Sequence, residues 1–271
     1  MLVLLCDTET NGLSFDEGAC VLEVAAALFD TKHAAVVESY SSLIYDGKVD
    51  KNEAEHVNGI PIELVKAEGN VPFTVWNRFA SMAQQATCIV AHRAEFDQGF
   101  VDKSIAAIAH DLAALRTDVD AEARAGLHIE QWAALGRPWV CTKSDFEWPN
   151  KLRGDSLVQL ALGLGLGVAS AHRAMADVDT TARCLTRVAE ILHAREREEI
   201  EPCMVGTVDI LEPLFRRAMR PKVRVVALVP FEQKDLAKQA GFFWEPSRRE
   251  WYRMMPQEDI DKLNFRAVVR A

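Results

Sequence analysis

An apolar run at residues 2–6 leads directly into two acids, Asp7 and Glu9, which are one residue apart. Burying a carboxylate is costly unless it is paired or binds a metal ion, so a core strand does not normally run into two of them. Alternate side chains of a strand emerge on one face, which places both carboxylates side by side at the strand end. The stretch therefore predicts the edge of a buried sheet that presents two hard oxygen ligands.

The apolar patterns along the chain predict one large α/β domain. Strands are predicted over residues 2–6, 19–30, 34–45, 87–92 and 138–142. Helices are predicted over residues 73–86, from about residue 95, over 155–165 with Asp155 as N-cap, and over 177–194. The short polar connection between the second and third strands favours an antiparallel meander. Three strands followed by alternating helices and strands predict a sheet of mixed direction.

The charge of the chain is unevenly distributed. Its 271 residues, enough for one large and one small domain, carry a net charge of −9. Residues 213–271 hold 13 Lys and Arg against 7 Asp and Glu, a net charge of +6, which leaves −15 for the rest. Two solvated surfaces of opposite sign would explain this asymmetry. An acidic, metal-binding body joined to a module that contacts polyanions would explain it as well.

The six cysteines show neither close pairing nor metal-finger spacing, which indicates reduced core residues in a cytoplasmic protein. A zinc or disulfide framework is not expected. No apolar run approaches the roughly 18 residues that a membrane span requires, and residues 2–6 are too short for the core of a signal peptide.

Acids recur in a fixed order along the chain. Asp97 follows the short strand at 87–92, and His172 lies five residues before Asp177 at the start of the last strong helix. That spacing would turn the two side chains about 140° apart on a continuous helix, so we place His172 in the preceding loop and Asp177 in the first turns. Each acid alone has an ordinary explanation as a turn, a cap or a helix N-terminal charge. The ordered set favours one shared cleft.

Three segments resemble the motifs of a known enzyme family. DTETNGL (7–13), AHRAEFD (91–97) and HRAMAD (172–177) resemble the three motifs of the DnaQ-like, DEDDh-type 3′→5′ exonucleases. WVCT, EWP and LVQLALGLGL, which precede the third motif, are similar to the exonuclease X branch, and HVNGI is similar to the family's segment between the first two motifs. The resemblance covers about residues 1–195. It implies an RNase H-like mixed sheet flanked by helices, in a domain that we place at 1–196.

The resemblance also implies two-metal catalysis. By this likeness, Asp7, Glu9, Asp97 and Asp177 hold two Mg²⁺ or Mn²⁺ ions, and His172 is the general base for the attacking water. These cations prefer oxygen ligands, and two of them about 3.5–4 Å apart stabilise both the attacking and the leaving oxygen. Without metal, four converging carboxylates would repel one another and some of their pKa values would rise. A histidine that titrates near neutrality can accept the proton of the water.

Further residues are implied to bind substrate. The likeness suggests that Leu13 and Phe96 pack against the terminal base, and that His56 and the backbone of Thr8 lie near the terminal nucleotide. Core packing is an equal alternative for Leu13 and Phe96, and His56 is equally explained as a loop residue. The second motif commonly carries Asn where this chain has Arg93. Arg93 either contacts phosphate or is a solvated loop residue.

These features predict a metal-dependent 3′→5′ exonuclease. We expect it to release nucleoside 5′-monophosphates from DNA 3′ ends, single-stranded ends above all, in DNA repair, proofreading or end processing. An RNA-trimming exoribonuclease stays open, because the acids contact phosphate and metal rather than base or sugar. A non-cutting module that tethers nucleic acid is a second alternative. We expect a monomer or homodimer without membrane association, and a DNA polymerase or another replication or repair protein as a partner.

A connector over 197–221 and a small basic α+β domain over 222–271 are predicted to follow. The domain begins with a strand and a helix, continues with a strand pair turned at Pro246 and Ser247, and ends with a short helix. Its sequence resembles an uncharacterised module found beside primase-like and other DNA-processing proteins, a likeness that assigns no activity.

Aromatic residues are concentrated in this small domain. Six of the chain's 21 aromatics lie within residues 231–252, interleaved with Lys and Arg, as in stacking platforms for single strands. A domain of about fifty residues also needs large side chains for its core. We expect core positions for Phe242 and Trp244 and leave Trp251 and Tyr252 open. The hypothesis is that this domain contacts nucleic acid and feeds a single-stranded 3′ end into the active site.

Overall fold

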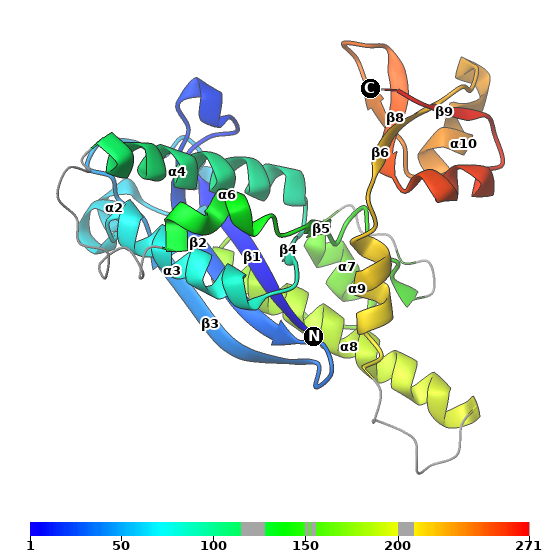
Figure 1. The fold of residues 1–271 in the computed structure, drawn as a ribbon, viewed down its shortest axis with the longest axis horizontal. Coiled ribbons are helices and arrows are strands. Elements are labelled where there is room, and N and C mark those ends of the chain that lie inside the picture. The colour runs from blue at the N-terminus through cyan, green and yellow to red at the C-terminus, as the bar shows by residue number, and fades with distance from the viewer. Residues whose placement is uncertain (115–127, 150–151, 153–155, 200–208, 271) are drawn as a thin grey trace. The chain divides into compact units, whose positions relative to one another are not determined.

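The computed structural model describes residues 1–114, 128–149, 152, 156–199 and 209–270. They form two compact units, Met1–Phe215 and Arg216–Ala271, which are described one at a time (Figure 1).

The first unit is built on a five-stranded mixed sheet with the strand order β3-β2-β1-β4-β5. Its strands are β1 (Leu2–Thr10), β2 (Val21–Asp30), β3 (Ala35–Leu43), β4 (Ile89–Ala91) and β5 (Trp139–Cys141). The strands β1, β2 and β3 form an antiparallel meander, whereas β4 runs parallel to β1 and β5 runs parallel to β4. The predicted mixed sheet and its meander are therefore confirmed.

Helices connect and cover this sheet. They are α1 (Glu55–Asn58), α2 (Ile62–Glu68), α3 (Pro72–Gln85), α4 (Ala94–Ala114), α6 (Trp132–Leu135), α7 (Leu157–Gly163) and α8 (Ala174–Glu199), with 3₁₀ turns η1 (Phe15–Glu17) and η2 (His128–Gln131). The helix α9 (Glu212–Ala218) spans the boundary between the two units. The N-cap of α7 is Ser156, whose hydroxyl accepts a 3.2 Å hydrogen bond from the backbone N–H of Gln159. The prediction of Asp155 as N-cap was wrong by one position, and Asp155 lies outside the described residues. No helix in the described part of the chain is long and apolar enough to cross a bilayer.

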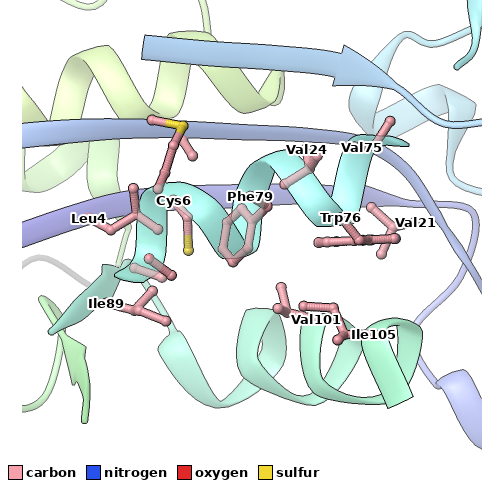
Figure 2. Packing of buried hydrophobic residues seen from close by; sticks show 14 of the residues in the cluster. Leu4, Cys6, Val21, Val24, Val75, Trp76, Phe79, Ile89, Val101 and Ile105 are labelled. Carbon is pink, nitrogen blue, oxygen red and sulfur yellow. The ribbon is translucent and has the colours of Figure 1, made fainter. Parts of the chain in front are cut away.

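One face of the sheet packs against α3 and α4. Leu4 and Cys6 alternate along β1 and point into this core, where they meet Trp76 and Phe79 of α3 (Figure 2). The two aromatic rings lie 5.7 Å apart at an interplanar angle of 76°, an edge-to-face arrangement that aromatic pairs favour. Val101 of α4 completes the layer. This packing fixes the strand β1, which carries the acidic pair, on the face of the sheet that α3 and α4 cover.

The other face of the sheet is covered by α8, which packs on β1 and β2. Val178, Leu185 and Val188 recur at helical spacing and are fully buried. The prediction of a strong helix with an apolar stripe in this segment is confirmed. Because α8 begins within the third motif, at Ala174, this packing brings the motif to β1.

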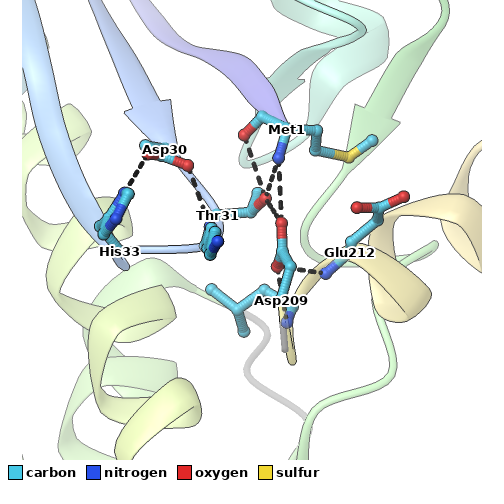
Figure 3. Close-up of polar contacts among 8 residues, drawn as sticks. Met1, Asp30, Thr31, His33, Asp209 and Glu212 are labelled. Carbon is cyan, nitrogen blue, oxygen red and sulfur yellow. Dashed lines mark hydrogen bonds and ion pairs between the residues drawn. The ribbon is translucent and has the colours of Figure 1, made fainter. Parts of the chain in front are cut away.

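Part of the predicted connector packs against the first unit. The carboxylate of Asp209 accepts a 2.9 Å hydrogen bond from the amino group of Met1 and another from the hydroxyl of Thr31 (Figure 3). Phe215 is fully buried, with its ring 5.2 Å from the ring of Phe146. This segment therefore contributes to the core of the first unit.

The five described cysteines, namely Cys6, Cys20, Cys88, Cys141 and Cys184, carry free thiols. Burial raises the pKa of the Cys88 and Cys184 thiols to about 12, so both stay protonated at neutral pH. Cys203 lies outside the described residues.

The second unit is a small antiparallel sheet with one helix. Its sheet order is β7-β8-β6-β9, with the strands β6 (Val223–Ala227), β7 (Phe243–Glu245), β8 (Glu250–Met255) and β9 (Ala267–Val269). The remaining elements are α10 (Lys234–Gln239), η5 (Phe231–Gln233) and η6 (Gln257–Lys262). The predicted α+β class of this domain is confirmed, but a 3₁₀ turn, η6, replaces the predicted short helix, and the strand β9 that follows it was not predicted. Its core contains Phe242, as expected, but Trp244 is 45% exposed, so the core prediction for Trp244 was wrong.

Candidate active site

Three carboxylates meet at the face of β1 that α8 covers. One oxygen from each of Asp7, Glu9 and Asp177 lies within 4.8 Å of the others. Asp7 and Glu9 share this face because strand side chains alternate, and Asp177 comes from the first turn of α8. The two strand acids lie within β1 rather than at its end, because β1 continues to Thr10. The register of the pairing between β1 and β2 shifts between Glu9 and Thr10, directly after the two acids.

The fourth acid, Asp97, is held next to this group from the α4 side. It lies in the first turn of α4 and is 3% exposed. Its Oδ1 accepts a 3.0 Å hydrogen bond from the backbone N–H of Thr8 and a 2.8 Å bond from the Thr8 hydroxyl. Asp97 is not one of the three acids that converge within 4.8 Å, yet its charge helps to raise the pKa of Asp7. The backbone N–H of Thr8 is thus used to orient an acid.

Burial and mutual repulsion raise the pKa values of these acids. Desolvation is the largest cause for Asp7, followed by the charges of Asp97, Asp177 and Glu9. Glu9 reaches a pKa of about 7, through burial and then the charge of Asp177. Burial raises the pKa of Asp97 to about 7, although the hydrogen bonds from Thr8 partly offset this by lowering the pKa. A divalent cation would turn this repulsion into attraction, so the donor set fits such an ion.

Two residues of the motif loops have unusual backbone geometry. His172 lies in the loop before α8 with φ of 61°, and Arg93 lies in the turn between β4 and α4 with φ of 80°. Left-handed conformations of non-glycine residues cost on the order of 1–3 kcal/mol and concentrate at functional sites. The backbone N–H of His172 donates a 3.2 Å hydrogen bond to Oδ2 of Asp177. The predicted placement of His172 in a loop and Asp177 in the first helical turn is confirmed.

An ion pair between a buried glutamate and a partly exposed arginine supports this loop and was not predicted. Glu23 of β2 lies opposite Glu9 in the antiparallel pair and is 4% exposed. Its two carboxylate oxygens accept hydrogen bonds of 2.8 and 3.0 Å from Arg173, and one of them also accepts a 3.1 Å bond from the N–H of Ala174. Arg173 directly follows His172. The signal in the sequence was a lone acid inside an apolar strand, which requires a partner when buried.

Comparison with known proteins places this site in a family. The family described as Exonuclease matches residues 4–185, which is more than half of the chain. The chain belongs to this exonuclease family. It therefore carries a 3′→5′ exonuclease domain, which is a hydrolase. A domain of unknown function (DUF8626) matches residues 223–269, and no curated protein sequence matches the chain.

Solved structures share the fold of the exonuclease domain. A zinc-bound complex of E. coli exonuclease I with single-stranded DNA has a TM-score of 0.51 and 19% identity, over 73% of this chain and 42% of that chain. Exonuclease I with a dA16 oligonucleotide has a TM-score of 0.52 and 16% identity, over 85% and 48%. Exonuclease X with a 5′-overhanging duplex has a TM-score of 0.46 and 19% identity, over 70% and 92%. The chain spans less than half of exonuclease I, whose likeness confirms the predicted RNase H-like fold.

The candidate substrate residues of the exonuclease lie outside its acidic group. Leu13 is 88% exposed, so the core alternative for Leu13 was wrong. Phe96 is half-buried, with its ring 4.9 Å from the ring of Phe100, and packs against the core. His56 is exposed in the single turn of α1, and Arg93 is exposed as well. These positions offer an apolar contact and a cation to a substrate.

Proposed function

We propose that the exonuclease hydrolyses DNA from 3′ ends and releases nucleoside 5′-monophosphates in a reaction that depends on divalent metal ions. The observation that carries this proposal is the convergence of Asp7, Glu9 and Asp177 within 4.8 Å, with the buried Asp97 beside them. Four carboxylates with raised pKa values have no evident structural purpose, since their repulsion destabilises the metal-free fold. Together with His172 they supply the DEDDh set that the motifs predict.

Asp7, Glu9, Asp97 and Asp177 would hold two divalent ions, Mg²⁺ or Mn²⁺. When bound, such ions stabilise the charge that develops on the attacking and leaving oxygens of the phosphodiester. The oxygen-only donor set suits these hard cations and does not favour a thiolate-binding metal. Because the pKa values of Glu9 and Asp97 are about 7, both acids are substantially ionised at mildly alkaline pH and ready to bind cations.

His172 would act as the general base. Its imidazole is exposed and therefore accessible to a water molecule, while its backbone is fixed by the hydrogen bond to Asp177. The pair of Glu23 and Arg173 holds the next residue of the same loop, so the imidazole needs little reorganisation to accept the proton of the attacking water.

The substrate contacts follow from exposure and charge. The exposed Leu13 would contact the terminal base, with Phe96 as a supporting aromatic surface. Arg93 would contact a phosphate through its guanidinium. His56 and the backbone of Thr8 would lie near the terminal nucleotide, with the Thr8 N–H donated to Asp97.

DNA is the preferred substrate class in this proposal. The two exonuclease I structures that share this fold contain single-stranded DNA or a dA16 oligonucleotide. RNA stays the alternative, because the acids of the site would contact phosphate and metal rather than the base or the sugar. A role in DNA repair, proofreading or end processing, with a DNA polymerase or another replication or repair protein as partner, is proposed on the same basis. A cytoplasmic location, a monomer or homodimer, and the domain limits 1–196, 197–221 and 222–271 are proposed from the sequence alone. The packing of Asp209 and Phe215 in the first unit favours a later end for the first of these domains.

The test is a cleavage assay on 5′-labelled single-stranded DNA and RNA of the same sequence. Each is incubated with Mg²⁺, with Mn²⁺ or with EDTA, beside an Asp7→Asn variant that keeps the size of the side chain. A ladder that shortens from the 3′ end, only with metal and only with Asp7 present, is the expected result. Faster loss of RNA would transfer the proposal to the exoribonuclease. Binding without cleavage of either strand would overturn it in favour of the tethering module.

A further inference from the structure

The C-terminal unit contains a cleft of about 420 Å³ at one end of its sheet. The end of β6 forms its apolar floor. Aromatic and cationic side chains surround this floor, namely Phe231, Trp244, Trp251, Arg248, Arg249 and Arg270. The volume lies in the range of about 300–1,000 Å³ that is typical of small-molecule sites, so the cleft can admit one unstacked base with its sugar.

Two aromatic side chains of the cleft, Phe231 and Trp244, are exposed beyond what the core requires, whereas Trp251 is partly buried against the core. Val225, Phe242 and Met255 already fill the core of this unit. Trp244 is nevertheless 45% exposed and Phe231 is 74% exposed. Because β7 and β8 pair Trp244 with Trp251, the two indole rings lie 5.5 Å apart. An exposed cluster of large rings indicates an interaction site and provides faces on which planar groups can stack.

The cations of the cleft favour a polyanion. The unit carries 13 Lys and Arg against 7 Asp and Glu over residues 216–271. The one acid that lines the cleft, Glu250, is neutralised, since its two oxygens pair with Arg224 at 2.7 Å and Arg270 at 2.9 Å. Arg249, in the turn between β7 and β8, makes no ion pair with any residue that the structure describes, and it is exposed. Its charge is therefore available to a ligand.

We propose that this cleft binds single-stranded DNA. A base stacks on the exposed Trp244, with the tilted ring of Trp251 beside it, and Arg248 and Arg249 contact the flanking phosphates. A single strand is favoured over a duplex because the bases of a duplex are already stacked on each other. The choice of DNA among single-stranded polyanions rests on the proposed function of the exonuclease domain.

The test measures binding of a fluorescent oligo-dT by the full-length chain. All proteins carry Asp7→Asn so that no cleavage occurs during the titration. Trp244→Ala is expected to weaken binding by about 5- to 150-fold, the range that loss of one stacked base produces. Trp244→Phe, which keeps a stacking ring, is expected to stay within about threefold of the parent. This second variant separates loss of stacking from loss of folding.

A matched control exists on the neighbouring residue. Phe243 is 46% exposed on the same strand but does not line the cleft, so Phe243→Ala removes an equally exposed ring. It is expected to leave the affinity unchanged. An equal loss in Phe243→Ala and Trp244→Ala, or no loss in Trp244→Ala, would overturn the proposal.

The cationic contact has its own readout in the salt dependence. Arg249→Gln is expected to lower the slope of log affinity against log salt by about 0.7, the value for one phosphate contact on a single strand. Arg266→Gln makes the same change in net charge at an exposed residue outside the cleft, and its slope should match the parent. Identical slopes for both variants would refute a specific phosphate contact by Arg249.

Competitors and a parallel cleavage assay separate the proposals. Unlabelled duplex DNA should compete less well than oligo-dT, and stronger competition by RNA or by an acidic peptide would overturn the choice of ligand. Cleavage of the same oligonucleotide is measured with Asp7 intact. Binding that depends on Trp244, without any cleavage, would support the proposed DNA-binding cleft and refute the proposed exonuclease activity. Cleavage, together with binding that does not change in Trp244→Ala, would support the exonuclease activity and refute the DNA-binding cleft.

Discussion

Glu23 and Arg173 are joined by two hydrogen bonds of 2.8 and 3.0 Å, although 150 positions separate them in the sequence. A bidentate pair fixes the orientation of both planar groups as well as their distance. Through this pair, the strand β2 holds the residue that directly follows His172. The position of the general base proposed for the reaction therefore depends on an ion pair between a buried Glu23 and a partly exposed Arg173.

The first prediction concerns this positioning pair. Glu23→Gln keeps the shape of the side chain but removes its charge, so the loop that carries His172 loses its anchor. We expect the turnover number on a short oligonucleotide to fall by about 10- to 100-fold, the usual effect of losing an outer-shell partner, with little change in KM. Steady-state kinetics well below the melting temperature measures this.

The control for this prediction is Glu38→Gln. Glu38 of β3 also pairs with an arginine, Arg78, but at the surface, where such a pair contributes about 0–1 kcal/mol to stability. Its turnover number should match the parent. A lower melting temperature of Glu23→Gln with an unchanged turnover number would show that the pair is purely structural.

The second prediction concerns the hydroxyl of Thr8. Thr8→Val keeps the shape but removes the 2.8 Å hydrogen bond to Asp97, one of the contacts that lower the pKa of that buried acid. We expect the free energy of unfolding at pH 8 to fall by about 1.5–3 kcal/mol, the contribution of a hydrogen bond to a charged group. The loss should be smaller at pH 6, where Asp97 is largely protonated. Urea unfolding at both pH values measures it, with Thr8→Ser, which keeps the hydroxyl, as control. An equal loss at both pH values would contradict the assignment.

The third prediction links pH, metal and stability. The folded-state pKa values of Glu9 and Asp97, about 7 each, lie above their unfolded values of about 4, so the folded protein binds more protons than the unfolded chain between these limits. Stability from these groups is present below pH 4 and is lost as the pH rises through 7. In EDTA, the melting temperature should therefore fall between pH 5 and pH 8.

Added Mg²⁺ should reduce this fall, because a cation replaces the protons that relieve the repulsion. Glu9→Gln, which removes one of the repelling charges, should reduce it in EDTA as well. Thermal unfolding scans with and without Mg²⁺ provide the measurement. A melting temperature in EDTA that rises from pH 5 to pH 8 would exclude this linkage. An equal fall of the melting temperature in Glu9→Gln and in the parent would exclude it as well.

The sequence predicted those parts of the fold that depend on local periodicity. The apolar stripe of α8 and the apolar strand β2 are visible in one dimension because one or both of their faces are buried. The end of β1 was placed too early because Asp7 and Glu9 interrupt its apolar run, whereas the backbone pairing with β2 continues to Thr10. The hydrogen-bonded pairing of β1 with β2 is formed by backbone groups, and the pattern of apolar side chains does not show how far this pairing extends.

The candidate site was predictable where its residues stand in ordered motifs, and not where they act through long-range pairs. His172 and Asp177 followed from spacing on a helix. Glu23 and Arg173 did not, because nothing local connects residues 150 positions apart. The exposure of Trp244 beside the buried Phe242 depends on how the short strand β7 lies against β8, which three residues of sequence cannot determine.

The last prediction concerns where the exonuclease domain ends. A chain of residues 1–196 stops before Leu211 and Phe215, both fully buried in the first unit, and before Asp209, which binds the amino group of Met1. A chain of residues 1–218 retains all three, so we expect it to melt at a clearly higher temperature. Loss of a buried phenylalanine side chain alone costs about 3–5 kcal/mol, so Phe215→Ala in the longer chain should reproduce most of the difference. Leu162→Ala, at an exposed position, should change little. Equal melting temperatures for the two chains would instead support a domain that is complete at residue 196.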